Sequence, residues 1–258
     1  MQVFEFHFNP PLRQGSAGHS PDLIFDSFCF EPENIYEKRV GSLYMLGFLK
    51  NVLPQNNRLL DNLAKAIRER YYKLTLKSPE KALKESLKTA NVFLEEIAKK
   101  GDVSWLGNLS WACLSLKNFE LNFTKVGEIK ILLLRKGQIV DIDKRLKFQD
   151  IEPYPLKVFP NIVSGKLAEN DLLLVLTKEV ADFFLSGDLL SKIAKITPFD
   201  ERKLREIFKA GAEDLEKITG ICFLIFLNKE ALGGKRKMIS FQLRPKKFSF
   251  KEVFSPII

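Results

Sequence analysis

The alternation of apolar and polar positions is clearest in segment 119–142, FELNFTKVGEIKILLLRKGQIVDI. Its first part, Glu120–Val126, alternates as expected for a strand with one buried face. Gly127 interrupts the alternation, and Lys130–Arg135 is so apolar that we expect a central strand covered on both sides. A Lys-Gly pair then predicts a tight turn into a returning strand, Gln138–Ile142. We therefore predict three adjacent antiparallel strands in this segment.

Similar apolar or alternating runs predict further strands on both sides of that segment. The predicted strands are Val3–Phe8, Leu23–Phe30, Gly41–Leu49, Trp105–Leu116 and Ile218–Leu227. We also expect Ile162–Leu167 and Asp171–Thr177 to pair around an Ala-Glu-Asn turn, and Met238–Leu243 to be an edge strand.

Helical periodicity predicts two pairs of helices, each helix with a single apolar face. In the first pair, one helix has its apolar face at Leu59, Leu60, Leu63, Ala64, Ile67 and Tyr71. The other begins with Ser78 as N-cap and Pro79 at its first position, and ends at Lys99-Lys100-Gly101. The second pair is predicted at Val180–Ile196 and from Thr197-Pro198 to about Leu215. Because each helix has one apolar face, each must pack on a sheet.

The order of these elements indicates the fold class. Strand runs are grouped apart from helix runs, which favours an α+β fold over a parallel doubly wound sheet. Two helix pairs and two strand groups bury their apolar faces in a four-layer αββα sandwich, with two stacked antiparallel sheets between the helices. A length of 258 residues favours one large domain, predicted at 1–232, followed by a basic tail or linker at 233–258.

The formal net charge of +9 raises the question of an anionic partner. Most lysines are spread along predicted helix faces, and the aromatic residues have the spacing of buried strands, so no clear nucleic-acid site is expected. The concentrated basic residues are Lys235, Arg236, Lys237, Arg244, Lys246, Lys247 and Lys251. Binding of nucleic acid or an anionic surface through this tail is therefore an alternative function.

The lengths of the apolar runs and the numbers of cysteines and histidines limit the cellular location and the kinds of catalytic site that we expect. No apolar run is long enough to cross a bilayer, and the first residues do not resemble a secretory signal. Three separated cysteines, Cys29, Cys113 and Cys222, are typical of core residues in a reducing compartment, so we predict a cytoplasmic protein. Two histidines leave little room for a histidine metal centre or a histidine-dependent triad. Asp141-Ile142-Asp143 lacks the remaining ligands of a calcium loop, and we predict a solvated strand end there.

Several sequence segments, in their order and spacing, resemble conserved motifs of the metal-dependent protein phosphatases of type 2C, the PPM family. They are Asp26-Ser27-Phe28, ALKESLKTANVFLEEI (82–97), FTKVGEIKILLLRKGQIVDI (123–142), VSGKLAENDLLLVLT (163–177) and ITGICFLIF (218–226). The last four resemble the family's "A..AN..I" helix, its "vGDsraYLlR.G.l..l" meander, its "GD.lllcSDGl" strand and its "DNiTvivv" final strand. The resemblance covers about residues 22–227 and implies the αββα sandwich.

The resemblance also implies two divalent cations, Mg or Mn, which aspartates hold and which activate water against a phosphomonoester. Most of those acidic positions are replaced in this chain. The family's "DG" falls on Leu46-Gly47, its "SDG" on Thr177-Lys178-Glu179 and its "DN" on Glu216-Lys217. Asp26 alone remains on a family acidic position, and Glu216 is a longer-armed substitute. Asp26 and Glu216 are thus the weak metal candidates at an otherwise vestigial site.

Electrostatics decides between a working and a vestigial metal site. A lysine ammonium about 4 Å from a divalent cation is repelled by roughly 8 kcal/mol at an effective dielectric near 20. A millimolar magnesium site is worth only about 4 kcal/mol. We therefore expect no catalytic residue and no metal cofactor if Lys178 points inward. In that case Lys178 neutralises Asp26 or Glu216; otherwise it is a solvent-exposed loop lysine.

The predicted function is therefore a pseudophosphatase, a catalytically inactive PPM-type domain that serves as a regulatory or protein-interaction module. Its partner would be a protein of unknown identity. The alternative is an active metal-dependent serine/threonine phosphatase with a rearranged site. Its ligands would come from Asp26, Glu31, Glu179, Asp182 and Glu216.

Overall fold

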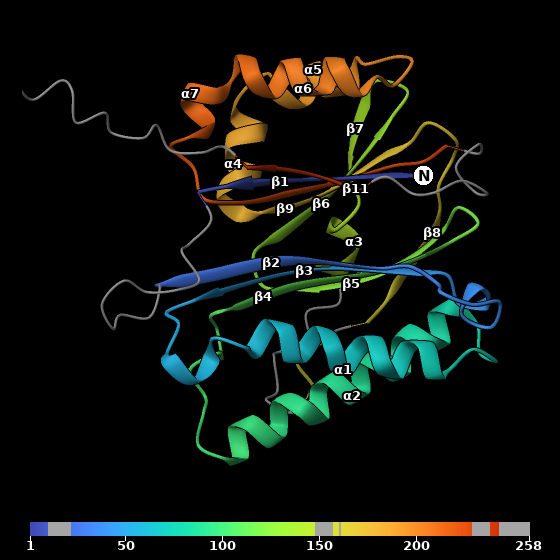
Figure 1. Cartoon of the computed structure of the whole chain (residues 1–258), viewed down its shortest axis with the longest axis vertical. Helices are drawn as coiled ribbons and strands as arrows, with labels where there is room; N and C mark the ends of the chain where they lie inside the picture. The colour runs from blue at the N-terminus through green and yellow to red at the C-terminus, as the bar shows by residue number, and fades with distance from the viewer. Residues whose placement is uncertain (10–21, 148–156, 160, 229–237, 243–258) are drawn as a thin grey trace, which may run out of the picture.

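The chain forms two stacked β-sheets with helices on both outer faces (Figure 1). The computed structural model describes residues 1–9, 22–147, 157–159, 161–228 and 238–242. The helices α1 and α2 cover one sheet, and α4 to α7 cover the other (Figure 1). The predicted α+β class and four-layer αββα arrangement are confirmed.

One sheet has six strands in the order β11-β1-β10-β9-β6-β7. Their bounds are β1 Gln2–Phe8, β6 Ile129–Arg135, β7 Gln138–Asp141, β9 Leu172–Thr177, β10 Gly220–Phe226 and β11 Met238–Gln242. Its neighbouring strands are antiparallel, except that β11 runs parallel to β1. The predicted edge strand thus exists, and it extends an otherwise antiparallel sheet by one parallel pair.

The other sheet has five antiparallel strands in the order β2-β3-β4-β5-β8. Their bounds are β2 Leu23–Phe30, β3 Ser42–Lys50, β4 Leu109–Lys117, β5 Glu120–Val126 and β8 Val163–Lys166. In β3, alternate side chains enter the core below the helices and the core between the sheets. This strand therefore has no solvent-facing side, and it is buried along almost its whole length.

Two predicted strand pairings are wrong, because the strands belong to different sheets. Strand β5 lies in the five-stranded sheet while β6 and β7 lie in the six-stranded sheet, so segment 119–142 is not a three-stranded meander. The chain crosses between the sheets at Gly127, whose φ is +70°. Likewise β8 pairs with β5, whereas β9 pairs with β6 and β10. Alternation reveals which face of a strand is buried, but it carries no information about the sheet to which the strand belongs.

The first helix pair has the predicted positions. Helix α1 is Leu59–Lys73 and buries the predicted face. Helix α2 is Pro79–Lys99, and the Ser78 hydroxyl accepts a hydrogen bond from the Lys81 backbone N–H at 3.4 Å. The single helices predicted at 180–196 and 197–215 are each divided in two. They form α4 Lys178–Ser186, α5 Leu189–Ala194, α6 Glu201–Ala210 and α7 Ala212–Leu215, with breaks at Gly187 and Gly211.

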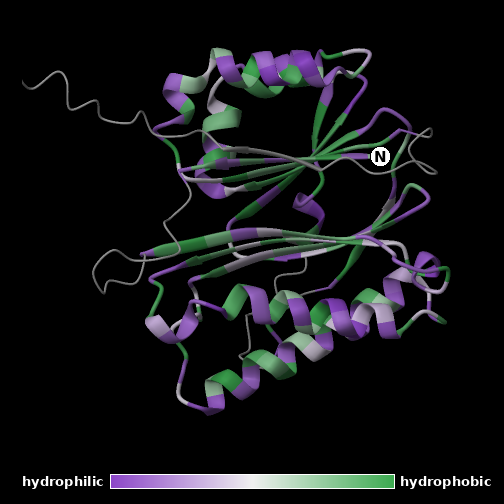
Figure 2. Ribbon diagram, viewed as in Figure 1, coloured by the Kyte–Doolittle hydropathy of each residue, from purple (hydrophilic) through white to green (hydrophobic). Residues whose placement is uncertain are grey.

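The remaining helical elements are short, namely α3 Lys144–Lys147 and the 3-10 turns η1 Glu37–Arg39 and η2 Pro54–Asn56. Hydrophobic residues are concentrated in the strands and along the inward faces of the helices (Figure 2). They form three core layers, one beneath each helix layer and one between the sheets. None of the helices in the described part of the chain combines the length and apolarity that a membrane crossing requires.

The predicted division at residue 232 falls within 229–237, outside the described residues. The same is true of the basic residues Lys235, Arg236, Lys237, Arg244, Lys246, Lys247 and Lys251. The domain boundary and the alternative function of the basic tail therefore stay predictions. Strand β11 nevertheless joins the sheet from beyond that boundary.

Candidate functional site

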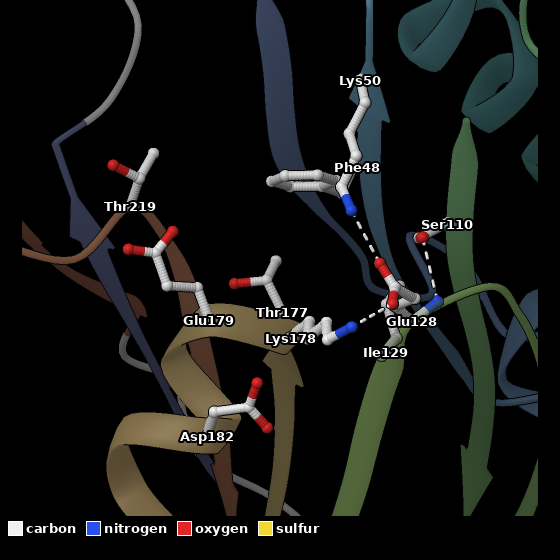
Figure 3. Close-up of a pocket in the computed structure, with 10 residues that line it drawn as sticks. All are labelled: Phe48, Lys50, Ser110, Glu128, Ile129, Thr177, Lys178, Glu179, Asp182 and Thr219. Atoms are coloured by element: carbon white, nitrogen blue, oxygen red, sulfur yellow. Dashed lines mark hydrogen bonds and ion pairs between the residues drawn. The ribbon is translucent and has the colours of Figure 1, made fainter.

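A pocket of about 330 Å³ lies at one end of the stacked sheets, where both sheets contribute residues (Figure 3). Its apolar lining comes from Phe48 on β3 and Ile129 on β6. The polar lining residues are Lys50, Ser110, Glu128, Thr177, Lys178, Glu179, Asp182 and Thr219. The pocket therefore combines a small apolar surface with several charged groups.

Glu128 occupies the crossing from β5 to β6 and is held on three sides. Its carboxylate forms an ion pair with Lys50 at 2.7 Å and a second ion pair with Lys178 (Figure 3). Its backbone N–H donates to the Ser110 hydroxyl at 3.0 Å. A Cβ atom on Gly127 would lie 2.4 Å from that hydroxyl oxygen, so the crossing requires glycine there. Because Lys50 ends β3 and Lys178 follows β9, the Glu128 carboxylate links the two sheets.

The charges of this cluster stabilise one another. Hydrogen bonds from Lys178 and then Lys50 lower the pKa of the Glu128 carboxyl, outweighing its slight burial. The hydrogen bond to Glu128 in turn raises the pKa of Lys178. The side chains of Lys178 and Glu128 are 57% and 43% exposed, so solvent screens their attraction. We conclude that the cluster fixes side-chain positions more than it stabilises the fold.

The start of α4 forms the opposite wall of the pocket. Thr177 is the N-cap residue, but its hydroxyl accepts a hydrogen bond from the Ile221 backbone N–H at 3.1 Å rather than capping the helix. A Cβ atom on Gly220 would lie 2.0 Å from that hydroxyl oxygen, so β9 and β10 approach closely only because this residue is glycine. Glu179 and Asp182 lie on the exposed surface of α4 and line the pocket.

Solved structures that align with most of this chain include bacterial serine and serine/threonine phosphatases. A mutant bacterial serine phosphatase aligns with a TM-score of 0.59 and 12% identity, over 88% of this chain and 99% of that one. The RsbU and RsbW domains of Rv1364c from Mycobacterium tuberculosis align with a TM-score of 0.54 and 14% identity, over 88% of this chain and 61% of that one. The chain has the PPM-type phosphatase fold.

The similarity to PPM-type phosphatases rests on comparison of structures, because no family profile and no curated protein matches the sequence. The catalytic domain of the serine/threonine phosphatase PstP, solved with two manganese ions, aligns with a TM-score of 0.50 and 10% identity, over 80% of this chain and 99% of that one. At such identities the likeness establishes the fold, and activity must be argued from the residues.

Among the predicted positions of the PPM metal site, Lys178 is the one that lines the pocket. It is the first residue of helix α4, not part of a loop. Its ion pair is with Glu128, which corrects the hypothesis that it neutralises Asp26 or Glu216. Glu216 is the exposed C-cap residue of α7 and does not line the pocket.

The three remaining positions lie on β2 and β3. Leu46 is fully buried in the core between the sheets. Gly47 packs against Trp111, whose Cζ3 atom would lie 2.5 Å from an added Cβ. Asp26 pairs with Gly47 across the strands, and its Oδ1 atom accepts a hydrogen bond from the Ser27 backbone N–H at 2.8 Å. Leu46 has no donor atom for a cation, and the glycine is explained by its contact with the tryptophan.

The ligands named for a rearranged metal site are brought together only in part. Glu31 accepts hydrogen bonds from the hydroxyls of Ser42 and Tyr44, each at 2.6 Å, while Glu179 and Asp182 line the pocket. Within the described residues, no three side chains of the metal-binding types converge. The carboxylate of Glu128 is already held by two ammonium groups, and Glu179 and Asp182 lie on the exposed surface of α4 without a third ligand from the described residues converging on them, so the residues present do not fit a pair of divalent cations.

Sequence reasoning missed Glu128, which lies at the centre of the site. A signal was present, because Val126-Gly127-Glu128 falls on the "vGD" of the family's meander and keeps an acidic residue there. The role of Glu128 depends on the crossing between the sheets, which the local sequence pattern does not predict. Nothing in the sequence indicates that Lys50 and Ser110 belong to the site, because each is an ordinary residue near the end of a strand.

A second charged cluster corrects the prediction of a solvated strand end at 141–143. The Asp143 side chain is fully buried and forms ion pairs with Lys125 and with Lys130, the latter at 3.1 Å. Lys130 also forms an ion pair with Asp141. Burial raises the pKa of Asp143, and the neighbouring Asp141 raises it further, while the two lysines act against this shift. The cluster joins β5 to β6 and β7, so it is a structural link and not an exposed end.

Proposed function

We propose that this chain is a catalytically inactive PPM-type phosphatase-like domain, a pseudophosphatase, that acts as a regulatory or protein-interaction module. The observation that carries the proposal is the placement of Lys178 in the pocket, with its ammonium on Glu128 and Lys50 on the same carboxylate. Two cations already neutralise the carboxylate at the centre of the site. A divalent ion there would have to displace both.

A comparison of electrostatic repulsion with the free energy of metal binding supports an inactive site. An ammonium beside a divalent cation repels it, and a millimolar magnesium site has little binding energy with which to offset that repulsion. Leu46 cannot compensate, because its buried side chain has no oxygen to offer. A pocket that does not hold the metal ions keeps its shape and its charges, which are the properties that a binding module uses.

We place the protein in the cytoplasm, with another protein as its partner. Cys29, Cys113 and Cys222 are all free thiols, which is usual in a reducing compartment. Burial raises the pKa of each of these thiols, so none is suited to act as a nucleophile.

Hydrolysis of para-nitrophenyl phosphate by the full chain tests the proposal, with and without millimolar manganese or magnesium. We expect no metal-stimulated turnover and, in calorimetry, no heat of metal binding. Robust manganese-stimulated hydrolysis that Asp26→Ala abolishes would instead establish the active phosphatase. Because Glu179 and Asp182 line the pocket, the double variant Glu179→Gln/Asp182→Asn is the matched test of a rearranged ligand set.

A further inference from the structure

Large apolar side chains are exposed at the end of the sandwich opposite the pocket. Leu76, Ile35 and Tyr36 are 88%, 72% and 60% exposed, the highest values among the large apolar side chains of the described residues. Ile35 and Tyr36 lie between β2 and β3, directly before η1, and Leu76 lies in the turn between α1 and α2. Both connections are at the right of the view in Figure 1, whereas α4 and the end of β3 are at the left.

Contacts between the β2–β3 connection and the end of α1 hold these two regions together. The Tyr72 hydroxyl, near the end of α1, donates to the carbonyl oxygen of Phe30 at 2.8 Å. Arg68, one turn earlier, forms an ion pair with Glu33 at 3.2 Å, and its guanidinium carbon lies 4.8 Å from the centre of the Phe30 ring. Leu76 is only three residues beyond α1, so this helix brings it to the loop that carries the other two apolar side chains.

Hydrogen bonds fix the shape of the loop before η1. The Asn34 side-chain oxygen accepts from the backbone N–H groups of Tyr36 and Glu37, each at 3.0 Å. The Asn34 amide and the Glu33 backbone N–H donate to the Glu37 carboxylate at 2.9 Å and 2.8 Å. The guanidinium carbon of Arg39 lies 5.7 Å from the centre of the Tyr36 ring. The two apolar side chains of this loop are therefore pre-organised, which lowers the entropy that binding through them would cost.

The charge around the three apolar side chains is mainly positive. Segments 33–39 and 73–77 hold two acidic residues, Glu33 and Glu37, and four exposed basic residues, Lys38, Arg39, Lys73 and Lys77. Both carboxylates are already engaged, one by Arg68 and the other by donors of its own loop. The end of the molecule therefore combines projecting apolar side chains with a basic surround.

This combination fits an anionic lipid surface better than a protein partner. A protein would need a cavity that matches the projecting side chains, whereas a lipid interface accepts them without one. Tyrosine is favoured at such interfaces because it has an apolar ring and a polar hydroxyl. Lysine and arginine side chains lie along apolar surface and keep their charge at the anionic headgroups.

We propose that this end of the sandwich binds an anionic lipid surface. Ile35, Tyr36 and Leu76 enter the interface, and the four basic residues face the headgroups. The pocket then faces away from the lipid, because it lies at the opposite end of the sheets. The inference is independent of the proposed function, since an active phosphatase would be oriented at the lipid in the same way.

Cosedimentation of the full chain with vesicles tests this proposal. Vesicles of phosphatidylcholine with about 30% phosphatidylserine should bind the chain, and phosphatidylcholine alone should bind it more weakly. In Ile35→Ser/Tyr36→Ser/Leu76→Ser we expect the affinity for the mixed vesicles to fall at least about tenfold, because this variant loses the inserted apolar surface. The matched control replaces three other exposed apolar residues and should bind as the wild type does; it is Val92→Ser/Val103→Ser/Leu185→Ser.

A pair of charge variants tests the basic surround. Lys38→Gln/Lys73→Gln should lower the affinity by about fivefold for each lysine. Lys203→Gln/Lys209→Gln makes the same change in net charge on the exposed side of α6, in the other helix layer, and should have little effect. Thermal unfolding of each variant checks that the fold is intact.

Three results would overturn the proposal. The first is the absence of binding to the phosphatidylserine vesicles, which would leave the surface to a protein partner. The second is equal binding by the wild type and the apolar triple variant. Both proteins keep the basic residues of 233–258, so equal binding would mean that charge in that tail is sufficient. The third is an equal loss of affinity in the two lysine variants, which would show that only net charge matters.

Discussion

Asp26 and Leu46 lie on neighbouring strands but on opposite faces of the five-stranded sheet. In the β2–β3 register Asp26 is opposite Gly47, and Leu46 is opposite Ser27. Leu46 enters the core between the sheets, while Ile24 and Phe28, two positions either side of Asp26, pack toward α1 and α2. An aspartate restored at position 46 would therefore not face the carboxylate of Asp26.

Leu46→Asp should destabilise the fold strongly and still fail to create a metal site. The substitution removes a fully buried leucine and places a carboxylate between the sheets. We expect the free energy of unfolding to fall by about 4 kcal/mol, or the chain to fail to fold. Leu46→Met is the control and should cost less than about 1.5 kcal/mol. Denaturant unfolding measures both, and a stable Leu46→Asp chain that binds manganese would contradict the prediction.

Gly47→Ala should destabilise the protein because of Trp111, independently of any metal. The added methyl group would overlap the indole ring at 2.5 Å and approach Leu60 at 3.1 Å. We expect a loss of about 1–3 kcal/mol in the free energy of unfolding. Gly165→Ala, on a strand where nothing lies within 4 Å of the added atom, is the matched control and should have little effect. Equal stability of the two variants would show that Gly47 is not held by packing.

Glu128→Gln should remove a pH-dependent part of the stability. Because the folded-state pKa of Glu128 is lowered, its contribution is present above the ordinary carboxyl value of 4.5 and is lost as pH falls through the folded pKa. Its size should be below about 1 kcal/mol, since the carboxylate is 43% exposed. Unfolding free energies of both proteins, measured from pH 3 to pH 7, should converge at the acidic end. A difference that grows as pH falls would exclude this assignment.

Asp143→Ala should be far more damaging than removal of an exposed carboxylate. It removes the fully buried carboxylate that Lys125 and Lys130 share, so Lys125 loses its ion-pair partner while Lys130 keeps Asp141. Breaking a buried ion pair in this way typically costs about 3–5 kcal/mol. Asp214→Ala, which removes the partner of the exposed Lys217, is the control and should barely change the denaturation midpoint. Similar effects of the two substitutions would mean that the buried cluster does not join the strands.

Local sequence patterns were sufficient to predict the helices α1 and α2 and most strands. The face of α1 followed from helical spacing, and the start of α2 from Ser78 and Pro79, because both signals act within a few residues. Sheet membership could not be predicted in the same way. Whether β5 pairs with β6 depends on contacts made by distant strands, and the glycine at the crossing fits a turn as well as a change of sheet.

The candidate site was predictable only in part for the same reason. The family resemblance identified Lys178, and the pocket contains it. Its partner Glu128 is 50 residues away in sequence, and no local rule connects them. The sequence predicts a solvated position for Asp143, since nothing in its neighbours indicates that lysines from two strands contact it.

The contact of Glu128 with two lysines connects the two sheets at the pocket. Lys50 belongs to the lower pair of layers and Lys178 to the upper pair, and one carboxylate fastens them at the pocket end. A ligand that draws either lysine toward itself would break one of the two ion pairs through which Glu128 connects the end of β3 to the start of α4.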